Sequence, residues 1–433
     1  MGEKIGVLGG GISGLTFSSL VKNSEVLEKE GGCGGLAKSI YDGEYIFDIG
    51  SHIIFSNNEK VLVYMLDLLG ENKIKHTRNS KIIFNGIEVK YPFENGLGDL
   101  PKEDAYDCLK GYVQAHVDRE TKKIGHPSNF KEWMLYRFGE GITNNYLYPY
   151  NRKVWDYLPE KMDIFWVDGR VPQPPVEDVI KAALKMKSEG YTHQLNFYYP
   201  NKGGYGALIR ALEERVGKGR IHTNFEIKKI KKEGRIWVVE GPKEKVYDQI
   251  VTTLHIRDFV NMYDGVDEEV IKASKKLRWN SIYIVVIGIK KNKINDIHWA
   301  YIPDNEILPN RISFHSNYSP NVAPKNCSTI VAEITYDPNG EKSKLSEREI
   351  IERTIEDLKT IKIINNDEIV YTKVVKYPYA YVVYDLEYKK NISIIEKFAK
   401  NEGITLLGRF SEFKYYNADK CIESAMEKAR LFL

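Results

Sequence analysis

The sequence is poor in cysteine and has no two cysteines close together. Only four occur in 433 residues, at Cys33, Cys108, Cys327 and Cys421, and none belongs to a CxxC pair. This scatter argues against a zinc site, a redox dithiol and a disulfide framework. We therefore expect no metal and a reducing, cytoplasmic environment.

Long apolar runs and a strong net charge are also missing. Runs such as residues 283–289 are far too short to span a bilayer, and the N-terminus reads directly into a strand without a signal-peptide pattern. The formal net charge is only +3, and the basic run at residues 228–232 alternates with acidic stretches. We expect no membrane span and no nucleic-acid partner.

Repeats and low-complexity linkers do not occur, yet 433 residues are too many for one simple core. Two or three packed sub-regions are expected, and the composition is that of a globular protein. Tyrosine is abundant, with 29 residues. Its flat ring and hydrogen-bonding tip suit both core packing and ligand contact, so its abundance decides nothing alone.

A glycine turn between a strand and a helix stands at the start of the chain. Residues 5–8 predict a buried strand, residues 9–14 read GGGISG, residues 15–21 are helical, and a second strand at 25–27 ends at an acidic residue. This order predicts a dinucleotide-binding fold rather than a merely structural turn. The candidate cofactor residues are Gly9, Gly11, Ile12, Ser13, Gly14 and Glu28.

A second glycine-dense loop follows at residues 31–37. A plain NAD-binding fold requires no such loop here, whereas extended FAD passes over more main chain. A flexible surface loop is the alternative, disfavoured because ordered, strand-like sequence follows directly. Gly34, Gly35, Leu36 and Ala37 therefore join the candidate FAD contacts.

The rest of the chain alternates between helices and strands. Helices are predicted at 99–117, 129–145, 177–190, 207–216, 345–360 and 420–432, and strands at 220–230, 236–246, 249–253, 280–290, 329–335, 368–376 and 404–409. This predicts an α/β protein with a discontinuous Rossmann-type FAD-binding domain at 1–90, 200–260 and 395–433. A helical insertion at 91–165 and an antiparallel-sheet substrate region at 166–199 and 261–394 would pack against it and leave a cleft for substrate.

Several ordered blocks resemble one family. They are residues 34–37, 47–56, 90–95, 148–155 with 169–171, 316–320 and 408–410. Together they resemble the UDP-galactopyranose mutases, especially the eukaryotic type, within the amine oxidase-like FAD flavoproteins. The blocks span nearly the whole chain in order, which is far more specific than a glycine motif.

The resemblance implies an isomerase with an unusual use of flavin. The family interconverts UDP-galactopyranose and UDP-galactofuranose, which feeds cell-surface polysaccharide biosynthesis, without net redox change. Reduced flavin attacks the anomeric carbon through N5, UDP leaves, and the N5–sugar adduct opens and recloses its ring. The partner implied is a UDP-galactose-type nucleotide sugar; homo-oligomerisation stays open.

The resemblance also assigns roles near the reacting centre. The residues implied to converge on the diphosphate are Arg170, Arg311, Tyr301, Tyr377 and Tyr415. Those implied to lie at the flavin are Gly50, Ser51, His52, Gly408 and Arg409, joined by Asn417, Ala418 and Asp419 at the start of the last helix. We expect His52 to contact flavin rather than act as a general base. The helix N-terminus would stabilise negative charge on reduced flavin.

An aromatic slot is implied for the uracil. The matching residues are Tyr91, Phe93, Glu94, Tyr146, Asn151, Trp155 and Gln194. A hydrophobic core of the helical insertion is the alternative, and for Trp155 the two are balanced. Arg78 and Ser80 match positions that contact NADPH in eukaryotic-type enzymes, so NAD(P)H is an expected reductant.

Three positions depart from the family pattern. Glu94 replaces a glutamine, Gln194 an asparagine, and Asn417 an aspartate of bacterial relatives. These changes leave a different nucleotide sugar open. The rival classes are an amine or protoporphyrinogen oxidase-like oxidoreductase and a catalytically silent nucleotide-sugar-binding homologue.

Overall fold

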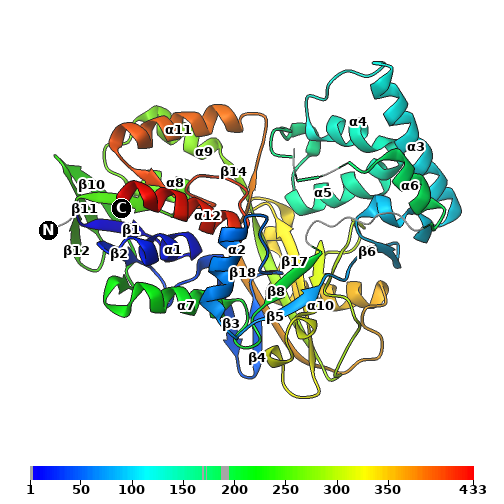
Figure 1. Ribbon diagram of the computed structural model, residues 1–433, viewed down its shortest axis with the longest axis horizontal. Helices are drawn as coiled ribbons and strands as arrows, with labels where there is room; N and C mark the ends of the chain where they lie inside the picture. Colours follow the sequence, from blue (N-terminus) through cyan, green and yellow to red (C-terminus); the bar gives the residue numbers. More distant parts are fainter. Residues whose placement is uncertain (1–2, 168–169, 172, 187–194) are drawn as a thin grey trace.

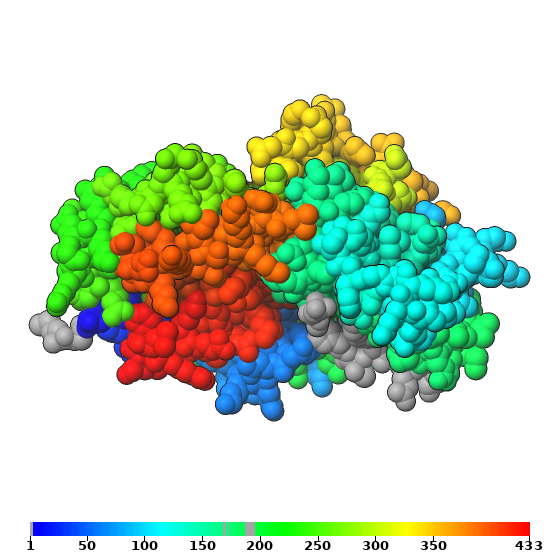
Figure 2. Space-filling view, turned by 90° about the horizontal axis from the view of Figure 1, so that it is seen from above, coloured from blue at the N-terminus to red at the C-terminus, as the bar shows by residue number. Residues whose placement is uncertain are grey.

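The computed structural model describes residues 3–167, 170–171, 173–186 and 195–433. The protein is a mixed α/β structure in which a nucleotide-binding fold, a large, mostly antiparallel sheet and a helical region follow one another along the long axis (Figure 1). Seen from above, the helical region in cyan lies at one end of an elongated molecule (Figure 2). The predicted fold class is confirmed.

A five-stranded parallel sheet forms the centre of the nucleotide-binding fold, in the order β19-β13-β1-β2-β9. The strands are β1 (Ile5–Leu8), β2 (Ser24–Leu27), β9 (Ile221–His222), β13 (Gln249–Thr252) and β19 (Thr405–Leu406). Alternating side chains of β1 point to opposite faces, so Val7 and Leu8 belong to different core clusters. The sheet is therefore covered on both faces.

Helices and a small sheet provide the two covering layers. On the Val7 side lie α1 (Ile12–Leu20), α2 (Glu59–Leu69), α7 (Gly206–Val216) and α12 (Ala418–Ala429). On the Leu8 side lie α8 (Ile256–Met262), α9 (Glu268–Lys276), α11 (Tyr388–Glu402) and an antiparallel sheet of β10 (Lys229–Glu233), β11 (Ile236–Glu240) and β12 (Glu244–Tyr247).

Two predicted strands are split in the structure. The strand expected at 220–230 is β9 and β10, which lie in different sheets, and the one at 236–246 is β11 and β12. Gly241 and Pro242 separate the latter pair, and a Cβ at Gly241 would collide with the Phe225 ring. These turn residues therefore end β11 at Glu240.

The large sheet has seven strands in the order β18-β14-β17-β16-β15-β6-β7. They are β6 (Ser80–Phe84), β7 (Ile87–Lys90), β14 (Arg278–Ile289), β15 (Trp299–Tyr301), β16 (Arg311–Ser313), β17 (Ser328–Tyr336) and β18 (Ile369–Val383). Helix α10 (Glu347–Thr360) covers one face, and the hairpin β3 (Ser39–Asp42)–β4 (Tyr45–Asp48) approaches the other. Because β6 and β7 belong to this sheet, the boundary expected at residue 90 of the FAD-binding domain is wrong.

The helical region follows β7. It contains the 3₁₀ turn η2 (Phe93–Asp99), α3 (Lys102–Glu120), α4 (Phe130–Ile142), the π-helical turn η3 (Thr143–Leu147) and α5 (Tyr148–Trp155). Helix α6 (Val176–Ala183) packs against α3 and η2, so part of segment 166–199 joins the helices; β8 (Asn196–Tyr199) of that segment pairs with β5 (Ile74–Thr77). Within the described ranges, no helix is both long and apolar enough to cross a membrane.

Candidate active site

The glycine turn joins β1 to α1 and leaves the helix N-terminus open. Gly9 has φ +105°, and a Cβ at Gly14 would overlap the carbonyl oxygen of Gly9. By contrast, a Cβ at Gly11 would meet no atom within 4 Å. Gly11 is the N-cap of α1, so the free N–H groups of Ile12 and Ser13 face space that a pyrophosphate could enter.

Glu28 follows β2 and is tied to this turn. One carboxylate oxygen accepts from the Gly10 N–H at 2.8 Å and the other from the Glu30 N–H at 2.9 Å. A carboxylate offers about four acceptor positions, so Glu28 keeps capacity for ribose hydroxyls.

The second glycine loop lies directly against the first. The Gly34 N–H donates to the Gly10 carbonyl at 2.9 Å, and Gly11 and Gly34 form a parallel bridge. Gly34 and Gly35 have φ of +125° and +54°, a region that favours glycine. The 3₁₀ turn Gly35–Ala37, which contains Leu36, continues the loop.

The C-terminal segment closes the same cradle. Gly408 has φ +85°, and a Cβ there would overlap the Ser13 hydroxyl. Arg409 donates through Nη1 to the Tyr416 carbonyl at 3.1 Å. Helix α12 begins at Ala418 after Asn417, earlier than the start expected at residue 420, and Asp419 accepts from Ser56 at 3.0 Å.

The loop that carries His52 connects this cradle to the large sheet. Gly50 has φ +93°, the Ser51 N–H donates to Glu333 at 2.9 Å, and the Ser51 hydroxyl contacts the Tyr318 hydroxyl at 2.7 Å. Burial, then the charges of Arg311 and Arg409, lower the pKa of His52 to about 3. The imidazole is therefore neutral, which does not suit proton donation at neutral pH.

Arg311 is fixed by a buried carboxylate on the neighbouring strand. Its Nε and Nη2 donate to the two Glu333 oxygens at 2.8 and 2.6 Å, and Glu333 is fully buried. Tyr301 lies opposite Arg311 on the other side, since β15, β16 and β17 pair in register. A guanidinium has five N–H donors, so three of those of Arg311 are free for an anion.

Two further arginines flank one tyrosine. The guanidinium carbons of Arg170 and Arg409 lie 4.4 and 5.1 Å from the Tyr415 ring centre, and Arg170 also donates to the Tyr415 carbonyl. The Arg409 guanidinium lies 4.9 Å from the ring of Tyr381, which in turn contributes to the environment of Arg311. These contacts link the three arginines around one region.

Tyr381, rather than Tyr377, is the β18 tyrosine that reaches this region. The Tyr377 ring lies 5.9 Å from Lys38 beside the second glycine loop, and no contact within the described part of the chain joins it to Arg311. Its expected place at the diphosphate is therefore not supported by these contacts. The predicted Gln194 lies outside the described residues.

Aromatic rings lie in layers at the place where the slot for uracil is expected. The half-buried rings of Tyr91 and Tyr301 are 4.9 Å apart, and Tyr146 stacks on Tyr150 at 5.4 Å. Phe93 stacks behind Tyr146 at 4.8 Å but is fully buried. Phe93 is thus a core residue that supports the slot, and its expected direct contact with uracil is not supported.

Asn151 and Trp155 act together on α5. The Trp155 indole N–H donates to Asn151 at 3.1 Å, and its buried ring packs 5.5 Å from the Tyr415 ring. Trp155 therefore lies behind Tyr415. Glu94 is only 6% exposed, and burial raises its pKa to about 7, so near neutral pH the group is partly protonated and can donate like glutamine.

Buried polar atoms without partners gather around the same region. Among the described residues they include Nδ1 of His52, Nε and Nη2 of Arg409, and both ring nitrogens of His315. Buried polar groups are almost always hydrogen-bonded, so such a set indicates a missing ligand. Together with the open space at Gly11, these atoms fit a bound flavin dinucleotide.

Four residues of the site were missed in the sequence: Glu333, Tyr381, Tyr150 and His315. Glu333 had a usable signal, because it is the single carboxylate within a fully buried strand. The other three have no local signal, since each is brought to the site by packing of distant elements.

The family model described as flavin containing amine oxidoreductase matches residues 21–431. The chain belongs to this family. It is therefore a flavin-dependent enzyme of the amine oxidase superfamily, and the flavin expected from the glycine loops is confirmed.

Solved structures of this superfamily share the fold. A reduced UDP-galactopyranose mutase matches with a TM-score of 0.92 and 24% identity over 99% of this chain and 93% of that one. A putative protoporphyrinogen oxidase from Exiguobacterium sp. 255-15 matches with a TM-score of 0.78 and 14% identity over 100% and 98%. A CLA-producing fatty acid isomerase from P. acnes matches with a TM-score of 0.66 and 14% identity over 100% and 99%. The expected resemblance to the mutases is confirmed at the level of the fold.

Proposed function

We propose that this flavoenzyme is a sugar-nucleotide mutase that interconverts UDP-galactopyranose and UDP-galactofuranose. The observation that carries the proposal is the gathering of Arg170, Arg311 and Arg409 around Tyr415 and Tyr381, next to the flavin cradle. Arginine forks match diphosphate oxygens and form charge-assisted hydrogen bonds with them. The fold match to a UDP-galactopyranose mutase supports the same reading.

The glycine turns, Glu28 and the Gly50–His52 loop would hold the flavin, which when reduced would supply a nucleophile for the anomeric carbon. The chain's own residues then have two tasks. Arg170 and Arg311 stabilise the charge that develops on the departing diphosphate and keep UDP bound for its return. Neutral His52 would contact the cofactor rather than act as a general base.

The aromatic slot would hold the nucleobase. Tyr91, Tyr146 and Tyr150 offer flat surfaces, and the Glu94 carboxyl, when protonated, would donate to a carbonyl of uracil. Tyr301 lies between this slot and Arg311, so base and diphosphate subsites would be continuous.

We further propose direct reduction by NAD(P)H. The Arg78 guanidinium lies 5.1 Å from the Tyr91 ring, at the edge of the slot, and Ser80 begins β6 close by. Anaerobic NADPH should bleach the flavin absorbance near 450 nm, and Arg78→Ala should slow the bleaching with dithionite reduction unchanged. Equal NADPH rates in both proteins would remove Arg78 from this role.

Turnover tests the main proposal. Purified protein, either oxidised or reduced with dithionite, is incubated with UDP-galactofuranose, and the nucleotide sugars are separated by chromatography. Conversion to UDP-galactopyranose in the reduced protein alone is expected. Unchanged substrate in both states, with oxidation of an amine or a porphyrinogen instead, would replace the mutase by an oxidase.

A further inference from the structure

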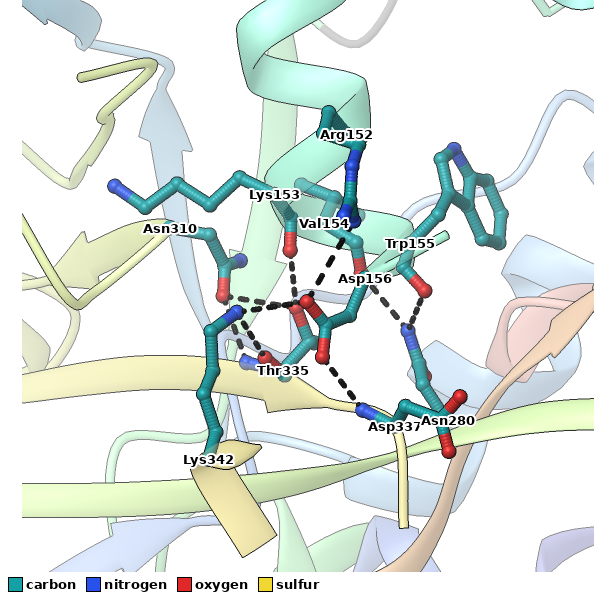
Figure 3. Close-up of polar contacts among 10 residues, drawn as sticks. All are labelled: Arg152, Lys153, Val154, Trp155, Asp156, Asn280, Asn310, Thr335, Asp337 and Lys342. Atoms are coloured by element: carbon teal, nitrogen blue, oxygen red, sulfur yellow. Dashed lines mark hydrogen bonds and ion pairs between the residues drawn. The ribbon is translucent and has the colours of Figure 1, made fainter. Parts of the chain in front are cut away.

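A cavity lies on the side of α5 opposite to Asn151 and Trp155. Its volume is about 690 Å³, and its walls come from α5, the loop at residues 304–308, the 3₁₀ turn η8 (Glu341–Lys344) and the start of α10. Helical geometry separates it from the slot: Asn151 and Trp155 share one face of α5, whereas Lys153 projects from the other. Figure 3 shows the Lys153 and Trp155 side chains leaving α5 in opposite directions.

The charges that line this cavity are unequal. Five lining side chains are cationic and three are carboxylates. The Asp156 carboxylate is shared by Lys342 at 3.1 Å and Arg152 at 3.8 Å, as Figure 3 shows. The other two carboxylates are also engaged, Glu341 with Lys344 at 2.6 Å and Glu349 in the N-terminal cap of α10.

Two cations remain without a carboxylate. None of the ion pairs within the described part of the chain involves Lys153 or Arg353. Lys153 is only 6% exposed, and its ammonium donates to the carbonyls of Ile302 at 3.1 Å and Asp304 at 2.7 Å. An ammonium has three donors, so one is left for a ligand.

The surroundings of Lys153 disfavour its charged form. Burial above all, helped by the charges of Lys342 and Arg353, lowers its pKa to about 7, although the charges of Asp304 and Asp357 oppose this shift. A buried cation without a counter-ion is costly. An anion in the cavity would relieve that cost and raise the pKa again.

We propose that this cavity binds a phosphate-bearing anion, held by Lys153 from within and by Arg353 at the mouth. Phosphate oxygens accept several charge-assisted hydrogen bonds at once, and a positively charged hollow concentrates anions. Arg152 and Lys342 extend the cationic wall beside these two. The same chemistry is offered by a free anion, such as inorganic pyrophosphate, and by the phosphates of a nucleotide.

The position of the cavity links anion binding to the active site through α5. The main chain and Asp156 at the end of α5 are hydrogen-bonded to the large sheet: Thr335 donates to the Lys153 carbonyl at 3.0 Å, Asn280 to the Val154 carbonyl at 2.8 Å, and the Asp337 N–H to Asp156 at 2.8 Å (Figure 3). An anion bound to Lys153 would therefore shift α5, and α5 also carries Trp155, which packs behind Tyr415.

The test is calorimetric titration of the flavin-loaded protein with inorganic pyrophosphate and, in parallel, with GDP. Arg353→Ala removes an exposed side chain and should weaken binding by roughly tenfold, the loss typical of one charge-assisted hydrogen bond. The matched control is Arg348→Ala on the same helix, an exposed arginine paired with Glu352 at 2.7 Å, which should leave binding unchanged. Equal affinities for pyrophosphate and GDP would identify the ligand as a free phosphate anion. A higher affinity for GDP would identify it as a nucleotide.

Proton uptake gives a second readout that needs no variant of the buried lysine. GDP is fully ionised at pH 8, so titrations with GDP at this pH in two buffers of different ionisation enthalpy should reveal proton uptake on binding, because the anion restores the charge of Lys153. Binding without proton uptake would overturn the role of Lys153. The cavity proposal fails if neither anion binds, if the two arginine variants behave alike, or if Arg170→Ala alone abolishes binding, which would place the anion on the flavin side.

Discussion

The carboxylate of Glu333 holds both the Gly50–His52 loop, through Ser51, and Arg311, the arginine proposed to bind the diphosphate, so its neutralisation has a definite cost. Glu333 is fully buried in β17 and accepts from Arg311 at 2.8 and 2.6 Å and from the Ser51 N–H at 2.9 Å. Glu333→Gln keeps the size of the side chain. It removes the negative charge and places an amide donor against an arginine donor.

Removal of one partner of a buried ion pair costs about 3–5 kcal/mol, because the other charge stays buried without compensation. Glutamine retains one acceptor, so we expect a loss of about 3 kcal/mol in the free energy of unfolding. Arg311 would also lose its two-pronged alignment, and turnover should fall on the order of 100-fold.

Urea unfolding followed by circular dichroism measures the first effect. Glu352→Gln, on the exposed face of α10, is the matched control and should change stability by less than about 0.5 kcal/mol. The double variant Arg311→Met with Glu333→Gln should be more stable than the sum of the single losses predicts, since no lone charge remains. A Glu333→Gln protein as stable as wild type would refute the buried ion pair as a determinant of this site.

Three further outcomes follow from the geometry. Gly11→Ala should fold normally yet purify with little flavin, because its Cβ would occupy the open space at the start of α1, and the flavin absorbance of the purified protein measures this loss. Gly14→Ala should instead lower the stability of the fold, because its Cβ would collide with the Gly9 carbonyl oxygen, and thermal unfolding measures that loss. The pKa of Glu94 is about 7 in the folded protein and about 4.5 in the unfolded chain, so the free energy of unfolding falls as the pH rises through this window. Glu94→Gln should therefore be up to about 3 kcal/mol more stable than wild type at pH 8 and equally stable at pH 4. Glu88→Gln, at an exposed position, should show no such difference between the two pH values. Arg170→Ala should keep its flavin, but its kcat/KM should be at least about tenfold lower than that of wild type. Equal kcat/KM values for the two proteins would contradict the proposed role of Arg170 at the diphosphate.

The nucleotide-binding fold could be predicted because its signals are local. A strand, three spaced glycines, a helix and an acidic residue lie within the first 28 residues, and the structure keeps that order. The membership of β6 could not be predicted in the same way. It pairs in parallel with β15, more than 200 residues away in the chain, and no short pattern encodes such a contact.

The exchange of Tyr377 for Tyr381 has a similar cause. Opposite β14, Asn280 pairs with Tyr381 and Ile282 with Tyr377, so β18 accommodates extra residues at an irregularity there. A bulge of this kind redirects the side chains that follow it. The sequence pattern predicts that a tyrosine of this strand lies near Arg311, whereas the bulge determines that this tyrosine is Tyr381.

The central claim is that the reduced flavoprotein breaks and re-forms the bond between sugar and UDP without net redox change. UDP-galactose labelled with ¹⁸O in the position bridging sugar and phosphate tests this directly by ³¹P NMR. The account predicts that the label scrambles into non-bridging positions in the reduced protein and stays in place in the oxidised one. A label that stays in place in the reduced protein would contradict it.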